Sequence, residues 1–149
     1  MINAKAETIA EKPAYKGCLK HKRCLILADS FYEWKKTKDG KRPYRIFLKN
    51  EEPFAFAGIW DLWEKGESAL VSCSIITTGA NALVKNIHDR MPVILPPEDE
   101  ARWLQAEDLE TALSLLKPFE AKKMDAYEIS AQVNSPRNDT ASILEPVGK

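Results

Sequence analysis

The stretch RCLILADSFYEW, from Arg23 to Trp34, decides the fold class of this chain. Its first seven residues form an apolar run of strand length, and the aromatic side chains that follow favour a pleated, half-buried surface. Residues 38–41 (KDGK) then supply an Asp-Gly turn signal, and residues 43–49 (PYRIFLK) alternate apolar with charged side chains. The sequence therefore predicts two buried strand segments followed by a β-hairpin.

Two further strand candidates lie at residues 53–63 (PFAFAGIWDLW) and 69–78 (ALVSCSIITT). The segment between them is polar and contains a glycine, as expected of a connection between paired strands. Residues 79–87 suit a short helix or turn, and residues 91–95 return to a strand-like composition. An antiparallel sheet is the expected result.

Helices are expected only late in the chain. Pro97 is followed by three carboxylates, which favours a helix start because proline and acidic side chains suit the first turn. Residues 109–116 place leucines at helical spacing until Pro118 ends the run. Residues 125–133 are expected to form a last strand, and residues 134–149 a loop-like tail. The fold class is therefore α+β: a mostly antiparallel sheet or barrel-like core with a few short helices.

Length and composition set the remaining limits. With 149 residues, 44% of them hydrophobic and 30% charged, the chain is expected to fold as a single domain over residues 1–149. The longest uncharged run, residues 68–84, is too polar and too short to cross a bilayer, and the first twenty residues carry no secretion signal. Three cysteines cannot all pair within one chain, which favours a reducing, cytoplasmic location.

The net charge of zero hides an uneven distribution, because residues 1–45 hold 12 Lys and Arg against five Asp and Glu. These basic side chains could form a groove for a nucleic-acid backbone with aromatic rings beside it, although a solvated basic surface is the more common explanation. The basic residues are Lys16, Lys20, Lys22, Arg23, Lys35, Lys36, Lys38, Lys41 and Arg42, and the rings are Tyr15, Tyr32 and Trp34.

Two titratable residues are candidates for proton transfer. Glu33 lies within an aromatic run, where apolar surroundings would raise its pKa toward neutrality; the alternative is an outward-facing strand glutamate. His88 lies between residues of both charge signs and could shuttle protons; the alternative is a structural or surface histidine. The neighbouring Asp89 could equally cap a helix or turn.

A zinc site is a third interpretation. Cys18, His21 and Cys24 form a C-x-x-H-x-x-C pattern that Cys73 or His88 could complete. Because this spacing is atypical of structural zinc sites, we expect no metal and no cofactor. The strand positions of Cys24 and Cys73 predict inert, buried thiols instead.

In combination, the motifs resemble the SRAP family, the SOS response-associated peptidases that shield abasic sites in single-stranded DNA. The resemblance depends on residues 3–8 (NAKAET), 23–34 (RCLILADSFYEW), 53–60 (PFAFAGIW), 76–78 (ITT), Asn81 and 87–95 (IHDRMPVIL). Family members use a cysteine directly after the initiator methionine, whose amine and thiol close a thiazolidine ring on the abasic aldehyde and crosslink protein to DNA. The resemblance thus implies an abasic-site lyase or self-processing peptidase of the DNA damage response.

The resemblance also assigns roles to individual residues. Glu33 would assist removal of the initiator methionine and proton transfer at the amine, His88 sugar ring opening and Schiff-base chemistry, and Asn3 the placing of the N-terminal residue. The expected DNA contacts are Lys5, Trp34, Thr77 and Arg90. Lys5 replaces the usual arginine and lacks its planar fork.

One departure from the family pattern is large. Family members open with M-C-G-R and a long segment before the first shared motif, whereas this sequence reads Met1-Ile2-Asn3. We therefore expect an N-terminally truncated domain without the nucleophile, inactive in crosslinking, whose exposed sheet edges lower its stability or promote self-association. The alternative function is a non-catalytic single-stranded DNA-binding module. The expected partner is abasic single-stranded DNA rather than a membrane, and a bacterial host would give a nucleoid-associated location.

Overall fold

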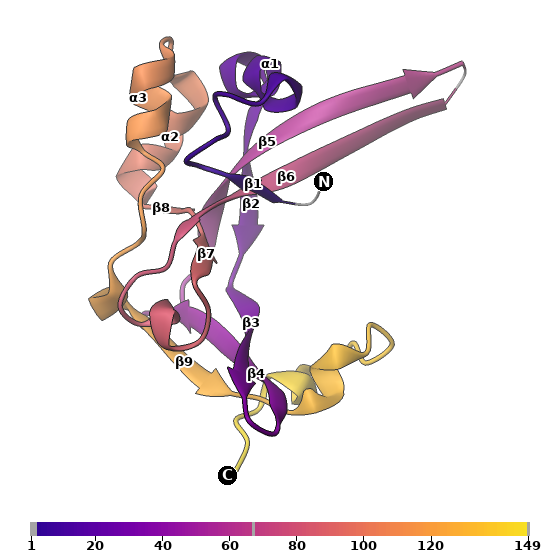
Figure 1. Cartoon of the computed structure of the whole chain (residues 1–149), viewed down its shortest axis with the longest axis vertical. Helices are drawn as coiled ribbons and strands as arrows, with labels where there is room; N and C mark the ends of the chain where they lie inside the picture. The colour runs from indigo at the N-terminus through magenta and orange to yellow at the C-terminus, as the bar shows by residue number, and fades with distance from the viewer. Residues whose placement is uncertain (1–2, 67, 149) are drawn as a thin grey trace. The chain divides into compact units, whose positions relative to one another are not determined.

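The structure of the chain is a computed structural model that describes residues 3–66 and 68–148 (Figure 1). The chain divides into two compact units. Unit 1 comprises Met1–Ala28, Phe54–Gly79 and Arg90–Phe119, and unit 2 comprises Asp29–Pro53, Ala80–Asp89 and Glu120–Lys149. Each unit contains one β-sheet, and the described chain is α+β as expected.

The sheet of unit 1 has the strand order β1-β6-β5-β2. The strands are β1 (Asn3–Lys5), β6 (Ser68–Gly79), β5 (Phe54–Lys65) and β2 (Arg23–Ala28). β2, β5 and β6 pair antiparallel, which confirms the expected sheet, whereas β1 pairs parallel with β6. The sheet is therefore mixed, and the three-residue β1 joins it across a sequence separation too large for local patterns to show.

Two short strands pair with β5 and β6 where these two strands no longer pair with each other. β7 (Arg90–Pro92) pairs with the inner end of β6, and β8 (Ile94–Leu95) pairs with the first half of β5. Between them, the Val93 N–H donates to the Ile76 carbonyl at 2.8 Å, and the Val93 carbonyl accepts from the Ala57 N–H at 2.9 Å. In the β6–β7 ladder, Arg90 is the partner of Gly79 at the end of β6.

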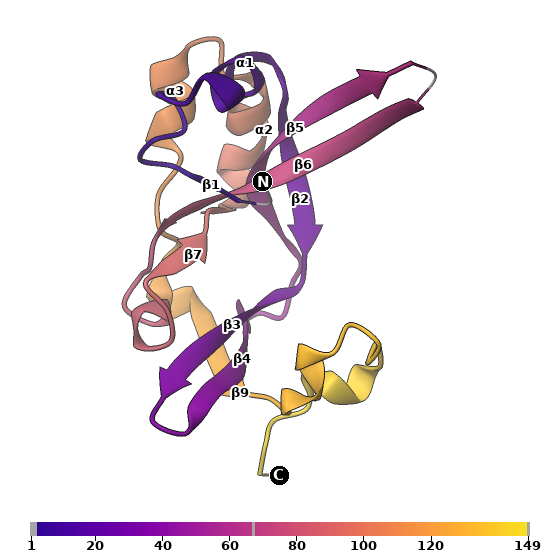
Figure 2. The same ribbon diagram turned by 45° about the vertical axis from the view of Figure 1, so that its right-hand side comes forward.

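The outer halves of β5 and β6 form a two-stranded arm, which Figures 1 and 2 show extending away from the helices of unit 1. β2 pairs with β5 only as far as Ile59, and β1 pairs with β6 only from Ile75 inward. Large apolar side chains on the arm are exposed, at 55% for Trp63, 60% for Leu70 and 66% for Val71. The arm thus carries apolar surface that no described part of unit 1 covers.

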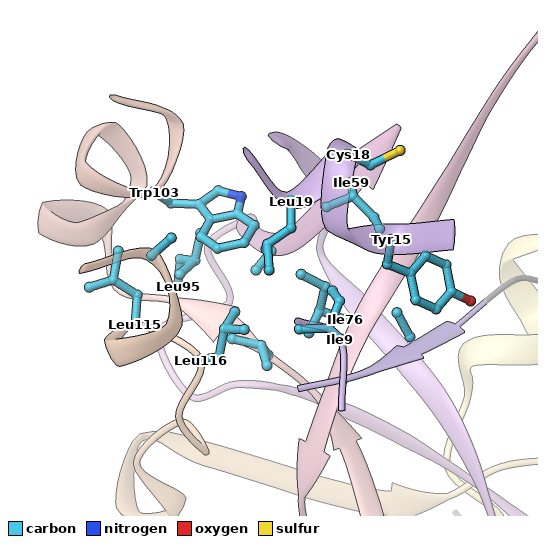
Figure 3. Close-up of a cluster of buried hydrophobic side chains, with 14 residues drawn as sticks. Ile9, Tyr15, Cys18, Leu19, Ile59, Ile76, Leu95, Trp103, Leu115 and Leu116 are labelled. Carbon is cyan, nitrogen blue, oxygen red and sulfur yellow. The ribbon is translucent and has the colours of Figure 1, made fainter. Parts of the chain in front are cut away.

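Three α-helices are found among the described residues, all in unit 1: α1 (Pro13–His21), α2 (Pro97–Gln105) and α3 (Leu109–Ser114). Both late helices were predicted, but α1 was not, so the expected order of strands first and helices late is wrong. α1 buries Tyr15, Cys18 and Leu19 in the hydrophobic core, where Leu19 lies beside Trp103 of α2 (Figure 3). No described helix is long and apolar enough to span a membrane.

Arg23, the first residue of β2, ties the ends of two of these helices together. Its guanidinium donates to the Leu19 and Lys20 carbonyls at the end of α1, at 2.7 and 3.1 Å. It also donates to carbonyls at the end of α2: Trp103 at 2.6 Å, Leu104 at 3.3 Å, and Ala106. The last carbonyls of a helix have no partner within the helix, so one side chain satisfies orphan acceptors of both.

The sheet of unit 2 has the order β3-β4-β9, with β3 (Ser30–Thr37), β4 (Gly40–Leu48) and β9 (Met124–Glu128). The predicted hairpin is confirmed, because Thr37 pairs with Gly40 and Gly40 adopts the positive φ of 122° that its turn requires. The last strand ends at Glu128 rather than residue 133, since Ser130 accepts a hydrogen bond from the Gln132 N–H and starts a 3₁₀ turn.

Short 3₁₀ helices make up much of the rest of unit 2. They are η1 (Val84–Asn86), η2 (Ala121–Lys123), η3 (Ala131–Asn134) and η4 (Ala141–Leu144). η1 confirms the helix or turn expected within residues 79–87, whereas η4 lies in the predicted loop-like tail. Ile46 and Met124 are buried on one face of the three-stranded sheet.

Candidate functional site

Unit 2 brings Glu33 and His88 together. Glu33 lies in the middle of β3, and its Oε1 is 4.0 Å from Nδ1 of His88, which follows η1. Burial raises the pKa of the Glu33 carboxyl above its ordinary value, against the lowering effects of His88 and of the Trp34 backbone N–H. Glu33 is therefore not the outward-facing surface glutamate of the alternative, and the pair is chemically suited to hold and pass a proton.

The loop that carries His88 is held by its own hydrogen bonds. The Asn81 side-chain oxygen accepts from the Leu83 and Val84 N–H groups at 3.1 and 3.0 Å, which starts η1. The His88 N–H donates to the Val84 carbonyl at 2.8 Å, and the Ala80 N–H donates to the Asp89 carbonyl at 3.0 Å. Asn81, which the sequence marked only as part of the family motif, thus shapes the loop.

Asp89, considered as a cap, takes part in an exposed ion pair instead. Its carboxylate lies 3.0 Å from Nζ of Lys85, and this hydrogen bond is the main reason that its pKa is lowered. Exposed pairs of this kind contribute little to stability. We therefore assign no chemistry to Asp89.

Unit 1 assembles a second cluster from Lys5, Glu7, Thr77 and Arg90, which we call the Arg90 cluster. The Arg90 guanidinium donates to the Thr77 carbonyl at 2.7 Å and to the Thr77 hydroxyl at 3.0 Å. It also donates to the Glu7 carboxylate at 2.8 Å, and this bond lowers the pKa of Glu7. Lys5 is the direct strand partner of Thr77, so β1, β6 and β7 together place two cations and a hydroxyl side by side.

Asn3 and Trp34 complete the set of predicted site residues. Asn3 pairs with Ile75 at the start of β1, two residues before Lys5, so the two side chains point to the same face of the sheet. Trp34 lies on β3 opposite Pro43, and its indole N–H donates to the Asn134 side-chain oxygen at 2.7 Å. Asn3 belongs to unit 1 and Trp34, Glu33 and His88 belong to unit 2, so each is placed within its own unit.

The expected basic groove is only partly available for binding. Arg23 uses its guanidinium on helix carbonyls, Lys22 pairs with Asp61 at 2.6 Å, and Arg42 lies 3.6 Å from Glu128. These contacts direct several of the basic side chains to protein partners. Glu7 and Asn134 are functional candidates that sequence reasoning missed, since neither residue type signals its partner in a local pattern.

The three cysteines differ in their surroundings. Cys18 is buried, Cys24 is half-buried and Cys73 is exposed, so the prediction of a buried thiol is wrong for Cys73. The reason is that Cys73 lies on the arm, where no other described element covers the strand. Burial raises the pKa of the Cys18 and Cys24 thiols, which disfavours the reactive thiolate.

The zinc interpretation finds no support in the structure. Among the described residues, no group of three or more His, Cys, Asp or Glu side chains is arranged to hold a metal ion. Cys18 and His21 lie on α1, and Cys24 lies on β2.

Both clusters lie within the residues that a known family profile matches. The family profile described as "SOS response associated peptidase (SRAP)" matches residues 1–136, and the chain belongs to this family.

Three relatives carry names that describe abasic-site processing. The chain is 49% identical to the abasic site processing protein YoqW of Bacillus subtilis, covering 97% of this chain and 66% of YoqW. It is 37% identical to HMCES of Gallus gallus, covering 97% and 50%, and 32% identical to YedK of Escherichia coli, covering 99% and 68%. The chain therefore spans between half and about two thirds of the length of these relatives.

The fold is also found among solved structures. A crystal structure of a protein from Bacteroides thetaiotaomicron matches with a TM-score of 0.90 and 38% identity, covering 97% of this chain and 65% of that protein. This similarity agrees with the α+β architecture derived above.

Proposed function

We propose that this chain recognises abasic sites in single-stranded DNA and carries the proton-transfer part of an SRAP site. The observation that carries the proposal is the half-buried Glu33 carboxyl, with its raised pKa, beside His88. The names of the relatives support the substrate class, since YoqW, HMCES and YedK are all called abasic site processing proteins.

The Arg90 cluster is suited to binding DNA phosphates. Arg90 and Lys5 supply positive charge and Thr77 a hydroxyl, and side chains of these kinds are typical phosphate ligands. Arg90 has the planar fork that can hold two phosphate oxygens, whereas Lys5 acts as a point charge. Trp34 supplies a ring on which an unpaired base can stack.

Proton transfer is the proposed role of Glu33 and His88. A closed abasic sugar opens to its aldehyde when one group takes the proton of the anomeric hydroxyl and another protonates the ring oxygen. A carboxyl and an imidazole can share these two tasks because both side chains can accept and donate a proton. We propose that Asn3 contributes its carboxamide to hold the reacting end in place.

We propose that none of the three cysteines of this chain carries out the covalent step of the family. A thiazolidine needs an α-amine and a thiol on one residue, and the nitrogens of Cys18, Cys24 and Cys73 are backbone amides. An amide cannot condense with the aldehyde to an imine, so these thiols give no stable ring. We propose that removal of an initiator methionine in this family uses Glu33 as the base and does not involve these cysteines.

The competing function is a binding module that holds single-stranded DNA through phosphate charge alone. The test incubates the chain with abasic and intact oligonucleotides of one sequence and measures affinity at several salt concentrations. Our proposal expects tighter binding to the abasic strand, together with loss of that preference in Glu33→Gln. Equal affinity for the two strands, unchanged in Glu33→Gln, would establish the binding module and overturn the proposal.

A denaturing gel of the same mixtures tests whether the chain becomes covalently linked to the abasic strand. We expect no adduct that survives denaturation unless borohydride is added, since only an imine that hydride reduces would be trapped. A heat-stable adduct that vanishes in Cys18→Ala, Cys24→Ala or Cys73→Ala would contradict the argument about amide nitrogens.

Two organisational expectations also stand as proposals. We propose that both units are parts of one SRAP domain, because the family match over residues 1–136 runs through segments of each.

We propose further that the exposed edge of β6 on the arm supports self-association, since residues 68–74 carry no charge that would oppose strand pairing. A Val71→Lys variant should then stay monomeric in light scattering where the parent chain associates.

A further inference from the structure

The indole of Trp34 has a fixed hydrogen-bond partner far away in the sequence. Its Nε1–H donates to Oδ1 of Asn134 at 2.7 Å, across a separation of 100 residues. An indole nitrogen is a donor only, so an acceptor at this place decides where the ring edge points. The terminal torsion of a tryptophan side chain is otherwise broad, so this bond restricts the orientation of the half-buried Trp34 ring.

The loop that presents Asn134 is itself well ordered by hydrogen bonds. The Ser130 hydroxyl accepts from the Gln132 N–H at 3.3 Å, and the Ser135 N–H donates to the Gln132 carbonyl at 3.2 Å. The Asn138 side chain donates to the same carbonyl at 2.8 Å. These bonds hold the turn that ends in Asn134, which is exposed and contributes nothing to the core.

The strand that carries Trp34 is fixed as well. Trp34 pairs with Pro43 in the β3–β4 ladder, and the Pro43 carbonyl accepts from the Ile129 N–H at 3.0 Å, just before the loop of Asn134. Trp34 and the start of its partner loop are therefore attached to the same strand, β4. This arrangement keeps donor and acceptor in register.

We propose that Asn134 is a positioning residue, which holds the Trp34 ring in the orientation that stacks on a DNA base. The inference rests on the proposed function, because stacking matters only if this chain binds single-stranded DNA. Asn134 acts through Trp34 and not by touching DNA itself.

A double-mutant cycle tests this dependence. We expect Asn134→Ala to weaken the affinity for abasic single-stranded DNA by about three- to fivefold, in keeping with the loss of one hydrogen bond. In a Trp34→Ala background, the same substitution should change affinity less than about 1.5-fold. Asn50→Ala is the matched control, since Asn50 is an exposed asparagine of unit 2 whose oxygen accepts from a neighbouring turn N–H.

The ring itself is observed in parallel, through the indole resonance of Trp34 in an NMR spectrum of the labelled chain. Asn134→Ala should shift this resonance and speed its exchange with water, whereas Asn134→Asp, which keeps the acceptor oxygen, should restore slow exchange. Slow exchange that persists in Asn134→Ala would overturn the positioning role.

The remaining outcomes are also decisive. Equal losses of affinity in the parent and Trp34→Ala backgrounds would show that Asn134 acts on DNA directly, which contradicts the proposal. If the parent chain binds neither abasic nor intact strands, the proposed function fails, and the indole resonance still reports whether Asn134 fixes the ring.

Discussion

The helical end and the strand edge of unit 1 are each organised around one arginine, and the two arginines differ in that, among the described residues, only Arg90 also binds a carboxylate side chain. Arg23 directs its guanidinium to backbone carbonyls at the ends of α1 and α2. Arg90 bonds to Thr77 on one side and to the half-exposed Glu7 carboxylate on the other. A backbone carbonyl is fixed by the fold, whereas an exposed carboxylate side chain can rotate away and be replaced by a phosphate. On this ground we treat Arg23 as structural, and we propose that Arg90 can bind a ligand in place of Glu7.

The largest expected effect concerns Arg23. Arg23→Ala leaves the carbonyls at two helix ends without their partner, so the free energy of unfolding should fall by about 3 kcal/mol. Urea denaturation followed by circular dichroism measures this loss. Arg23→Lys should recover only a small part, since a single ammonium cannot reach both helix ends. A loss below about 0.5 kcal/mol, the size of an ordinary surface substitution, would remove the distinction between the two arginines.

The next effect is on binding rather than stability. Arg90→Ala should weaken affinity for single-stranded DNA about tenfold and reduce the salt dependence by about one phosphate contact, while the unfolding free energy changes little. Affinity measured across a salt series gives both values. Should the salt dependence stay unchanged, Arg90 does not meet a phosphate and is structural like Arg23.

The next prediction concerns Glu33 in unit 2. Its carboxyl is half-buried, and the nearby His88 lowers its pKa by less than burial raises it. Because its pKa is raised by burial, its stabilising contribution is complete below the unfolded value near 4.5 and is lost as the pH rises through the folded value. Between the parent chain and Glu33→Gln, the difference in unfolding free energy should therefore change with pH, by at most about 1.4 kcal/mol per pH unit. Parallel pH profiles of the two proteins would refute this shift in pKa.

The smallest expected effect concerns Glu7, whose carboxylate accepts a hydrogen bond from the Arg90 guanidinium. Glu7→Gln removes the charge that competes with phosphate, so affinity for single-stranded DNA at low salt should rise about twofold. The gain should disappear in Arg90→Ala, which serves as the control background. A loss of affinity in Glu7→Gln would mean that the carboxylate orients Arg90 and does not compete with the ligand.

Much of the fold could be predicted because its signals are local. The Asp-Gly pair at residues 39–40 marks the β3–β4 hairpin, and the apolar runs around Leu25, Phe56 and Ile76 mark three strands. α1 was missed, although Pro13 in its first turn is the same start signal that marks α2. Its helix has a polar composition, no side-chain N-cap and a single glycine, and its stripe of Tyr15, Cys18 and Leu19 is meaningful only against the sheet that it covers.

Pairing and exposure depend on distant parts of the chain. Alternation predicts which face of β6 carries Cys73, but not that this face lacks a cover on the arm. For the same reason, the parallel pairing of β1 with β6 has no signature in three residues.

Glu33 and His88 are candidates both from their physical surroundings in the sequence and from the family motifs, whereas Arg90 is a candidate from the motifs alone. The structure adds their contacts, which are a shared unit for Glu33 and His88, and Thr77 with Glu7 for Arg90; their roles stay predictions. Asn134 could not be found from sequence, because a hydrogen bond spanning 100 residues leaves no local trace.

β6 connects the exposed arm to the Arg90 cluster along one continuous strand, from Ser68 in solvent to Thr77 beside the guanidinium. At roughly 3.3 Å per residue, this strand is about 40 Å long and has no break in its backbone. A probe attached to the outer end of β6 would therefore lie on the same strand as Thr77 without touching the Arg90 cluster.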